Sequence, residues 1–484
     1  MAWFGIALLV MVGAGIIASG LPAAVVLLTM ATLGACAGVA VGVIDAATLW
    51  ALPSRLINLL ESDVLQALPL YVTMGLLLDR LPVADALYRA AQAVLPRKLS
   101  APLVSGMLLG ALLGPMNGSV GASVLALSRV VAPRLAAEGI AAPQRHAIVA
   151  VASTLGVLVP PSLVLILLSD AMLSAHTIAV TATGRTDRVV NTQDIFHAAL
   201  VPGAIFLMLC LALSGFVGRS ATRLPKRAPL PAAQGWIAVT SLGFLLILLG
   251  GVALGYFYAV EAAAMGAFAL LAAGLLSGRL HKAVLNELLR DALALTGALF
   301  SLLLAATTFT MVLRLLGTAD LAGRMVSSIP GGDVAAVAVV LGLIAVSAFV
   351  LDAFEIIFVV VPIVIPPLLI RVADAQWVAV LVLLTLQSSF LLPPFGYALM
   401  MVRGVLKEPV AFRAFLRALA PFLAAQWLLL LSVLLFPQLT HPGKPPQEGS
   451  RLPPAALSDQ EFNRRLNEMI RPPEPEADAS PDRR

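Results

Sequence analysis

Nearly uncharged apolar runs, each about as long as a membrane is thick, are the feature that most constrains this chain. A helix needs about 20 apolar residues to cross the hydrocarbon core of a bilayer. Eight runs approach that length without a break: residues 2–19, 22–42, 64–78, 196–217, 236–255, 260–276, 291–316 and 415–436. They predict an all-α, polytopic membrane protein whose surroundings are the lipid bilayer.

The composition supports this class and excludes others. Of the 484 residues, 60% are hydrophobic and only 12% are charged, whereas a soluble domain carries about 25% charged residues. The net charge of +5 is typical of cytoplasmic loops and does not indicate a nucleic-acid partner. No basic segment precedes residues 2–19, so we expect a retained helix there and not a cleaved signal peptide.

Four further apolar segments are interrupted near the middle by Gly, Pro or polar residues. A hairpin-like segment at residues 100–138 precedes a broken helix at residues 143–171, and residues 333–370 and 376–402 repeat that order. Broken hydrophobic segments at matching places in two halves indicate the binding site of a transporter. We therefore predict two repeats, each with a re-entrant helical hairpin and a broken transmembrane helix.

These repeats define the predicted domains. An N-terminal membrane repeat at residues 1–218 is joined by a basic cytoplasmic linker, residues 219–235, to a C-terminal membrane repeat at residues 236–436. A polar insertion at residues 174–194 is predicted to face the periplasm. The charged, Pro-rich tail at residues 437–484 is predicted to be hydrophilic and mostly disordered.

The basic residues favour opposite orientations of the two hairpins. If one hairpin enters from each side, most basic loop residues fall on the cytoplasmic side, as the positive-inside rule requires. Five arginines then fall on the periplasmic side: Arg55, Arg185, Arg188, Arg324 and Arg371. The sequence therefore predicts an inverted repeat.

The interruptions also contain the residues predicted to bind ions. Unpaired backbone groups in hydrocarbon are costly, so broken helices persist where they line protein or a watery cavity. There, freed carbonyls and nearby hydroxyl oxygens form a shell that suits Na⁺. The candidate ligands are Asn117, Gly118, Ser119, Ser153, Thr154, Gly156, Asp352, Ser388, Ser389 and Pro393.

A substrate site is predicted between these ion sites, because exposed helix N-termini attract anions. Its candidate residues are Pro160, Pro161, Ser162, Glu355, Pro394, Phe395 and Gly396. Each position alone has a plainer interpretation: Ser or Gly as a helix contact, Pro-Pro as a kink, Asp352 and Glu355 as acids solvated in a water-filled cavity. The fourfold arrangement favours the functional interpretation.

Catalytic motifs are absent from the sequence. It contains no GxxxxGK[ST] phosphate loop and no HExxH, and nothing in it supplies Ser119 with a positioned His and acid. We therefore predict a secondary transporter and not an enzyme, with Na⁺ as coupling ion and no resident cofactor or metal.

The same residues resemble the large membrane subunit of tripartite ATP-independent periplasmic (TRAP) transporters, the DctM-like family. The resemblance extends to about Phe436. Its marks are Gly110–Gly114 before Gly118-Ser119, Ala152–Gly156 before Val159–Ser162, Glu261–Ala267, Leu351-Asp352 and Leu392–Gly396. The chain departs from the family at Asn117-Gly118-Ser119-Val120, at Ser153-Thr154, which lack a Gly between them, and at Tyr258–Ala262.

The resemblance implies an elevator-type carrier of the ion-transporter superfamily in the bacterial inner membrane. It further implies Na⁺-coupled uptake of a small organic acid, delivered by a periplasmic substrate-binding protein, and a separate small membrane subunit. Two alternatives stay open on the sequence. One is a stand-alone ion-coupled organic-anion carrier or exchanger, and the other is a membrane scaffold that transports nothing.

Overall fold

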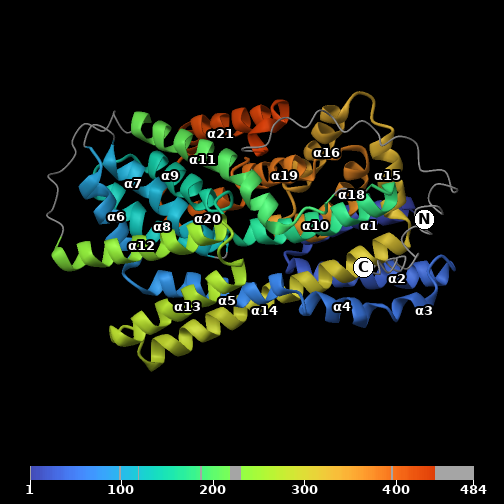
Figure 1. Ribbon diagram of the computed structural model, residues 1–484, viewed down its shortest axis with the longest axis horizontal. Coiled ribbons are helices and arrows are strands. Elements are labelled where there is room, and N and C mark those ends of the chain that lie inside the picture. The colour runs from blue at the N-terminus through green and yellow to red at the C-terminus, as the bar shows by residue number, and fades with distance from the viewer. Residues whose placement is uncertain are drawn as a thin grey trace, which may run out of the picture. The chain divides into compact units, whose positions relative to one another are not determined.

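The computed structural model describes residues 2–96, 100–117, 119–185, 188–217, 231–393 and 396–441, and all regular secondary structure in these ranges is helical (Figure 1). Residues 1–442 form one compact unit. The predicted linker lies outside the described residues up to position 230, and so does most of the predicted tail. The prediction of an all-α protein is confirmed.

Ten helical segments in the described ranges are long and apolar enough to cross a membrane. They are α1 (Ala2–Ser19), α2 (Ala23–Ala40), α8 (Val120–Ala137), α10 (Leu163–Thr183), α11 (Thr192–Val217), α12 (Ala232–Ala253), α13 (Ala259–Leu276), α14 (Lys282–Leu315), the segment Ala353–Arg371, and α21 (Phe412–Leu435). A bent pair, α5 (Asp63–Arg80) and α6 (Val83–Val94), passes the same test jointly with a 64° bend.

Hydroxyl side chains fit into these apolar helices because each can donate to a carbonyl of the preceding turn. Thr29 donates to Val25 O at 2.8 Å, and Ser169 donates to Leu165 O at 2.7 Å. The polar atom is thereby satisfied without leaving the helix, as a segment in lipid requires. Isolated Ser and Thr therefore do not interrupt the spans.

The helices break at the four predicted interruptions. In the first half, α7 (Ala101–Leu113) and the turn η2 (Gly114–Met116) precede α8, and α9 (Ala142–Leu155) precedes α10. In the second half, α16 (Asp333–Ser347) precedes α17 (Ala353–Glu355), the π-helical η4 (Ile356–Val360) and α18 (Val361–Arg371). Then α19 (Ala375–Ser389) precedes α20 (Tyr397–Leu406). The re-entrant course of the hairpins stays a prediction.

Several short helices lie outside the long apolar runs. They are α3 (Ala46–Leu49), α4 (Leu52–Leu60), α15 (Thr318–Ser327) and η5 (Pro437–Thr440). The segment 174–194 also differs from a simple polar insertion, because α10 continues as a helix to Thr183 and α11 begins at Thr192. Its periplasmic position stays a prediction.

Helix packing brings the two halves together. Within the first half, α7 and α8 pack on α9, and within the second half α16 packs on α19. Across the halves, α10 packs on α18 and α20 packs on both α8 and α9. A second group of contacts joins α5 to α13 and α14, and α14 to α2. The four interrupted segments therefore form one packed assembly.

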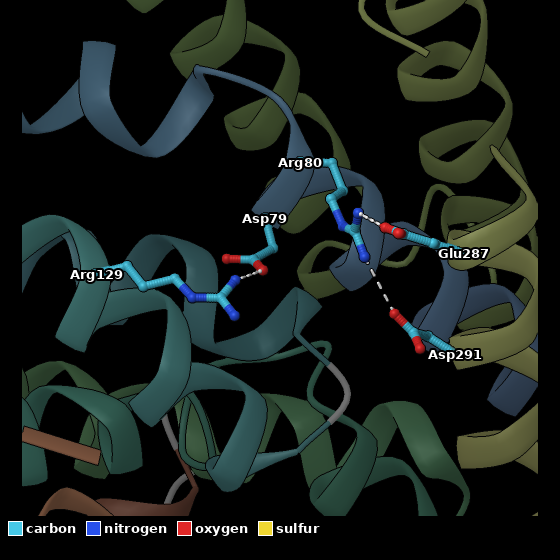
Figure 2. A network of polar contacts seen from close by, with 5 residues as sticks. All are labelled: Asp79, Arg80, Arg129, Glu287 and Asp291. Carbon is cyan, nitrogen blue, oxygen red and sulfur yellow. Dashed lines mark hydrogen bonds and ion pairs between the residues drawn. The ribbon is translucent and has the colours of Figure 1, made fainter. Parts of the chain in front are cut away.

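An ion-pair network at the end of α5 joins this assembly to α14. Asp79 accepts a hydrogen bond from Arg129 of α8 at 2.7 Å. The next residue, Arg80, bonds to Glu287 at 2.8 Å and to Asp291 at 3.2 Å, both on α14 (Figure 2). Two adjacent residues thus connect the first hairpin on one side and the long helix on the other.

Candidate functional site

The first hairpin and the first broken helix meet through glycine backbones. A Cβ atom on Gly114 would lie 2.7 Å from Gly156 Cα, and a Cβ atom on Gly156 would overlap the backbone of Gly114. One turn earlier, Gly110 lies equally close to the backbone of Ala152. No side chain fits between the two segments. The backbone of the hairpin tip at Gly114 therefore lies directly against the backbone of the helix break at Gly156.

Hydroxyl oxygens surround this crossing. Ser119 Oγ accepts from Ala122 N at 3.1 Å and caps α8, and Ser153 Oγ donates to Ala150 O at 2.7 Å. Ser162 Oγ donates to Val157 O at 2.8 Å and accepts from Leu165 N at 3.1 Å, which caps α10. Because the Ser153 proton is used within its own helix, the lone pairs of that oxygen stay available to a cation.

A small cavity with a volume of about 10 Å³ lies among these groups, lined by Ser119, Ser123, Ser153, Ser162 and Gly156 among others. That volume is about what one water molecule needs, so it suits a single ion or water and not an organic substrate. The cavity brings Ser119, Ser153 and Gly156 of the predicted ion ligands together with Ser162 of the predicted substrate residues.

Other predicted residues of the first half lie beside this cavity and do not line it. Asn117 is buried and donates from Nδ2 to Ser123 Oγ at 3.2 Å. Thr154 is fully buried and donates to Val151 O at 2.9 Å. Pro160 and Pro161 are buried within the break. Gly118 lies outside the described residues.

The second hairpin tip carries two acids that cap a helix start. Glu355 Oε2 accepts from the backbone N–H of Asp352 at 3.0 Å, in a reciprocal capping box at the start of α17. Glu355 is only 8% exposed, and Asp352 Oδ1 is buried without a hydrogen-bond partner among the described residues. A buried carboxylate oxygen without a donor is suited to accept a cation.

The second break begins at two buried serines. Ser388 Oγ donates to Leu384 O at 2.7 Å, and Ser389 Oγ donates to Leu386 O at 2.6 Å. Gly396 folds back against the chain, because a Cβ atom there would lie 2.7 Å from Phe390 O. Pro393 is half-buried, and Pro394 and Phe395 lie outside the described residues.

Two further sets of intramembrane polar residues lie outside the predicted site. Gln426 of α21 donates to Gln387 Oε1 at 3.0 Å and to Leu384 O at 3.1 Å, directly before Ser388. Gln387 Nε2 and Gln426 Oε1 have no hydrogen-bond partner among the described residues. Asp170 is a half-buried acid within α10. The sequence could have revealed them, because each is a polar or ionisable residue within an apolar run, where such residues are rare and functional.

Tyr397 connects the two halves. A Cβ atom on Gly121 at the start of α8 would lie 2.6 Å from the Tyr397 hydroxyl oxygen. The Tyr397 ring also lies 6.4 Å from the Phe390 ring. The first hairpin and the second break therefore meet at this side chain.

Comparison with known families agrees with this arrangement. The family model described as the DctM component of tripartite ATP-independent periplasmic transporters matches residues 4–439. The chain belongs to the DctM family. The resemblance inferred from the glycine and proline motifs is thereby confirmed, and the protein is a multi-pass membrane protein.

Individual relatives are distant in sequence. The C4-dicarboxylate TRAP transporter large permease protein DctM of Rhodobacter capsulatus is 24% identical over 214 residues, which is 42% of this chain and 46% of that protein. The chain thus spans about half the length of that relative. The uncharacterized protein YgiK of Salmonella typhimurium is 22% identical over 380 residues, covering 77% of this chain and 83% of YgiK.

A solved structure shares the fold. The YdaH transporter of Alcanivorax borkumensis, whose topology is described as unusual, superposes with a TM-score of 0.63 at 15% identity. The match covers 87% of this chain and 98% of that one. This DctM-family chain therefore has a transporter fold over most of its length.

Proposed function

We propose that the chain is the large permease subunit of a Na⁺-coupled importer in the bacterial inner membrane. The importer takes up a small organic acid that a periplasmic substrate-binding protein delivers, and it works with a separate small membrane subunit. The observation that carries this proposal is the packing of two interrupted hairpins against two interrupted helices, with oxygen atoms at every interruption.

Na⁺ coupling is supported by the chemistry of the available ligands. Ser119 and Ser153 offer neutral oxygens around a cavity of ion size, and backbone carbonyls freed at the breaks add more. In the second half, Asp352, Ser388 and Ser389 offer one carboxylate and two hydroxyls. Few charges and all-oxygen donors suit a monovalent hard cation better than a transition metal.

An organic anion is the substrate class that the helix starts favour. The N-termini of α10 and α20 follow directly on the two breaks, and helix N-termini attract carboxylates. We place the substrate between the breaks, near Ser162, Glu355, Gly396 and the Tyr397 contact. Its movement across the membrane is an elevator-like shift of the interrupted segments against α2, α5, α13 and α14.

The names of the family and of one relative guide the first assays. The family name, tripartite and periplasmic, supports a small membrane subunit and a binding protein as partners. The Rhodobacter capsulatus relative is named for C4-dicarboxylates, so succinate, malate and fumarate are the first labelled acids to supply.

The test reconstitutes the chain with its small subunit in proteoliposomes and leaves out one component at a time. We expect uptake only when the binding protein, the small subunit and an inward Na⁺ gradient are all present. Na⁺-driven uptake without the binding protein would instead identify a stand-alone carrier. No uptake of any acid by a correctly assembled complex would contradict the proposal and favour a scaffold.

A further inference from the structure

A large apolar cavity lies between α2, α3, α4 and α14. Its lining residues belong to none of the four interrupted segments. Its volume is about 600 Å³, within the range of ligand pockets. Ala35, Cys36, Leu49, Leu52 and Met311 are among its lining residues. A cavity of this size and lining suits a hydrocarbon chain.

The two hydroxyls in the lining do not make the cavity polar. Thr32 Oγ1 donates to Leu28 O at 2.8 Å, and Thr308 Oγ1 donates to Leu304 O at 2.8 Å, each within its own helix. Their protons are therefore already used, and the wall offers an occupant little beyond apolar contact.

Two arginines lie one helical turn beyond the lining. Arg55 follows the lining residue Leu52 by three positions on α4, and Arg314 follows Met311 by three positions on α14. Residues three apart lie on the same face of a helix, and α4 packs on α14. Arg55 and Arg314 therefore continue the two lining faces by one turn beyond Leu52 and Met311, on the predicted periplasmic side.

The two arginines are not paired with acids in the part of the chain that the structure describes. Neither side chain forms an ion pair with a described carboxylate. Arg314 is half-buried, and its hydrogen bond to Pro362 O is long, at 3.5 Å. Arg55 is exposed, so both side chains can take an anionic partner from outside the chain.

The surroundings of this pair indicate where the anion comes from. On the same segment, Trp50 is 81% exposed, Ile57 54% and Leu60 48%. Large apolar side chains exposed together suit contact with a membrane. The occupant with a long apolar part and an anionic head is then a phospholipid.

We infer that this cavity binds an anionic phospholipid, with one acyl chain among α2, α3 and α14 and its phosphate between Arg55 and Arg314. A net negative head is favoured over a zwitterionic one because two cations face it. Basic residues near a membrane surface attract anionic lipid heads.

Cys36 provides a direct readout, because it lines the cavity and is exposed, whereas Cys210 is buried. The purified full chain is placed in nanodiscs of phosphatidylcholine, with or without a fixed fraction of phosphatidylglycerol, and labelled with an apolar maleimide. We expect phosphatidylglycerol to slow the labelling of Cys36 by about 30-fold, the ratio that corresponds to two favourable charge contacts.

Variants test the arginine pair and the apolar cavity separately. In Arg55→Gln/Arg314→Gln, phosphatidylglycerol should no longer slow the labelling. Arg324→Gln, which changes an exposed arginine of α15, should keep the full protection. Ala35→Phe should fill the cavity and slow labelling equally in both lipid mixtures. Thermal unfolding midpoints and a Cys36→Ser control establish that each variant is folded and that the label is on Cys36.

Equal labelling of the wild-type chain in both lipid mixtures would overturn the inference, and so would protection that survives in the double variant. Protection by the small subunit alone, in the absence of phosphatidylglycerol, would also overturn it and identify a protein helix as the occupant. These outcomes do not depend on transport, so they are distinct from a failure of the proposed function.

Discussion

The two halves of the molecule break their helices at matching places but surround the breaks with different chemistry. The first region joins glycine backbones, with Gly114 against Gly156 and neutral serines around them. The second region places two acids, Asp352 and Glu355, in a capping box. What the halves share is the interruption of the helix, while acids at a hairpin tip belong to the second half.

This difference means that the two regions should fail in different ways. The first depends on close backbone contact, so added volume should disrupt it. The second depends on buried carboxylates and capped helix starts, so a change of charge at constant shape should alter ion binding without unfolding the protein. Four tests examine this contrast.

The largest effect is expected from Gly156→Ala. The added Cβ atom would overlap the backbone of Gly114, and overpacking of this kind costs about 1–3 kcal/mol or more. We expect a lower unfolding midpoint in detergent and loss of uptake. Gly250→Ala is the matched control, because no atom lies within 4 Å of a Cβ there. A Gly156→Ala protein with normal stability and uptake would contradict the close contact.

Asp352→Asn should act on ion binding instead. Asn is as good an N-cap as Asp, so the unfolding midpoint should stay near that of the wild type. Removing the buried carboxylate should raise the Na⁺ concentration for half-maximal uptake by about tenfold, the loss of one charged contact. Asp320→Asn, which changes an exposed acid of α15, serves as the control. Unfolding of Asp352→Asn would assign the residue a structural role.

Ser153→Ala and Ser389→Ala compare the two regions directly, because each variant removes one serine hydroxyl. Each removes one neutral oxygen, worth about 1 kcal/mol and thus roughly fivefold in Na⁺ dependence. Ser301→Ala, which removes an exposed hydroxyl bonded to Gly297 O, should leave the Na⁺ dependence unchanged. An unchanged Na⁺ dependence of uptake in both variants would show that neither serine is an ion ligand.

The smallest effect is expected at the network in Figure 2. Arg129 ties the first hairpin to Asp79 of α5, whereas Arg371 of the second hairpin pairs at 3.8 Å with Asp333 of the same hairpin. The Arg129 side chain is 65% exposed, so its pair is worth at most about 1 kcal/mol. A double-mutant cycle of Arg129→Gln and Asp79→Asn, read from unfolding midpoints, should give a coupling within that limit. A coupling of several kcal/mol would show a buried, structural pair.

Local sequence patterns predicted the helix breaks well, because Pro, Gly and polar residues in an apolar run act within one or two turns. The breaks at Gly156–Ser162 and Phe390–Gly396 are examples. Local sequence patterns did not predict the contacts between segments that are distant in the sequence. The approach of Tyr397 to Gly121 and the bond from Gln426 to Gln387 depend on how α20 and α21 pack. The short helices α4 and α15 were missed because their alternating polar residues hide them from a search for apolar runs.

The most direct test of the central claim is accumulation of labelled C4-dicarboxylate in proteoliposomes that hold the complete transporter, with the membrane potential set to zero. The account predicts that an inward Na⁺ gradient drives the internal acid above its external concentration, and that collapsing the gradient abolishes this excess. Accumulation that is independent of Na⁺, or equilibration without accumulation, would contradict a Na⁺-coupled importer built on the two break regions.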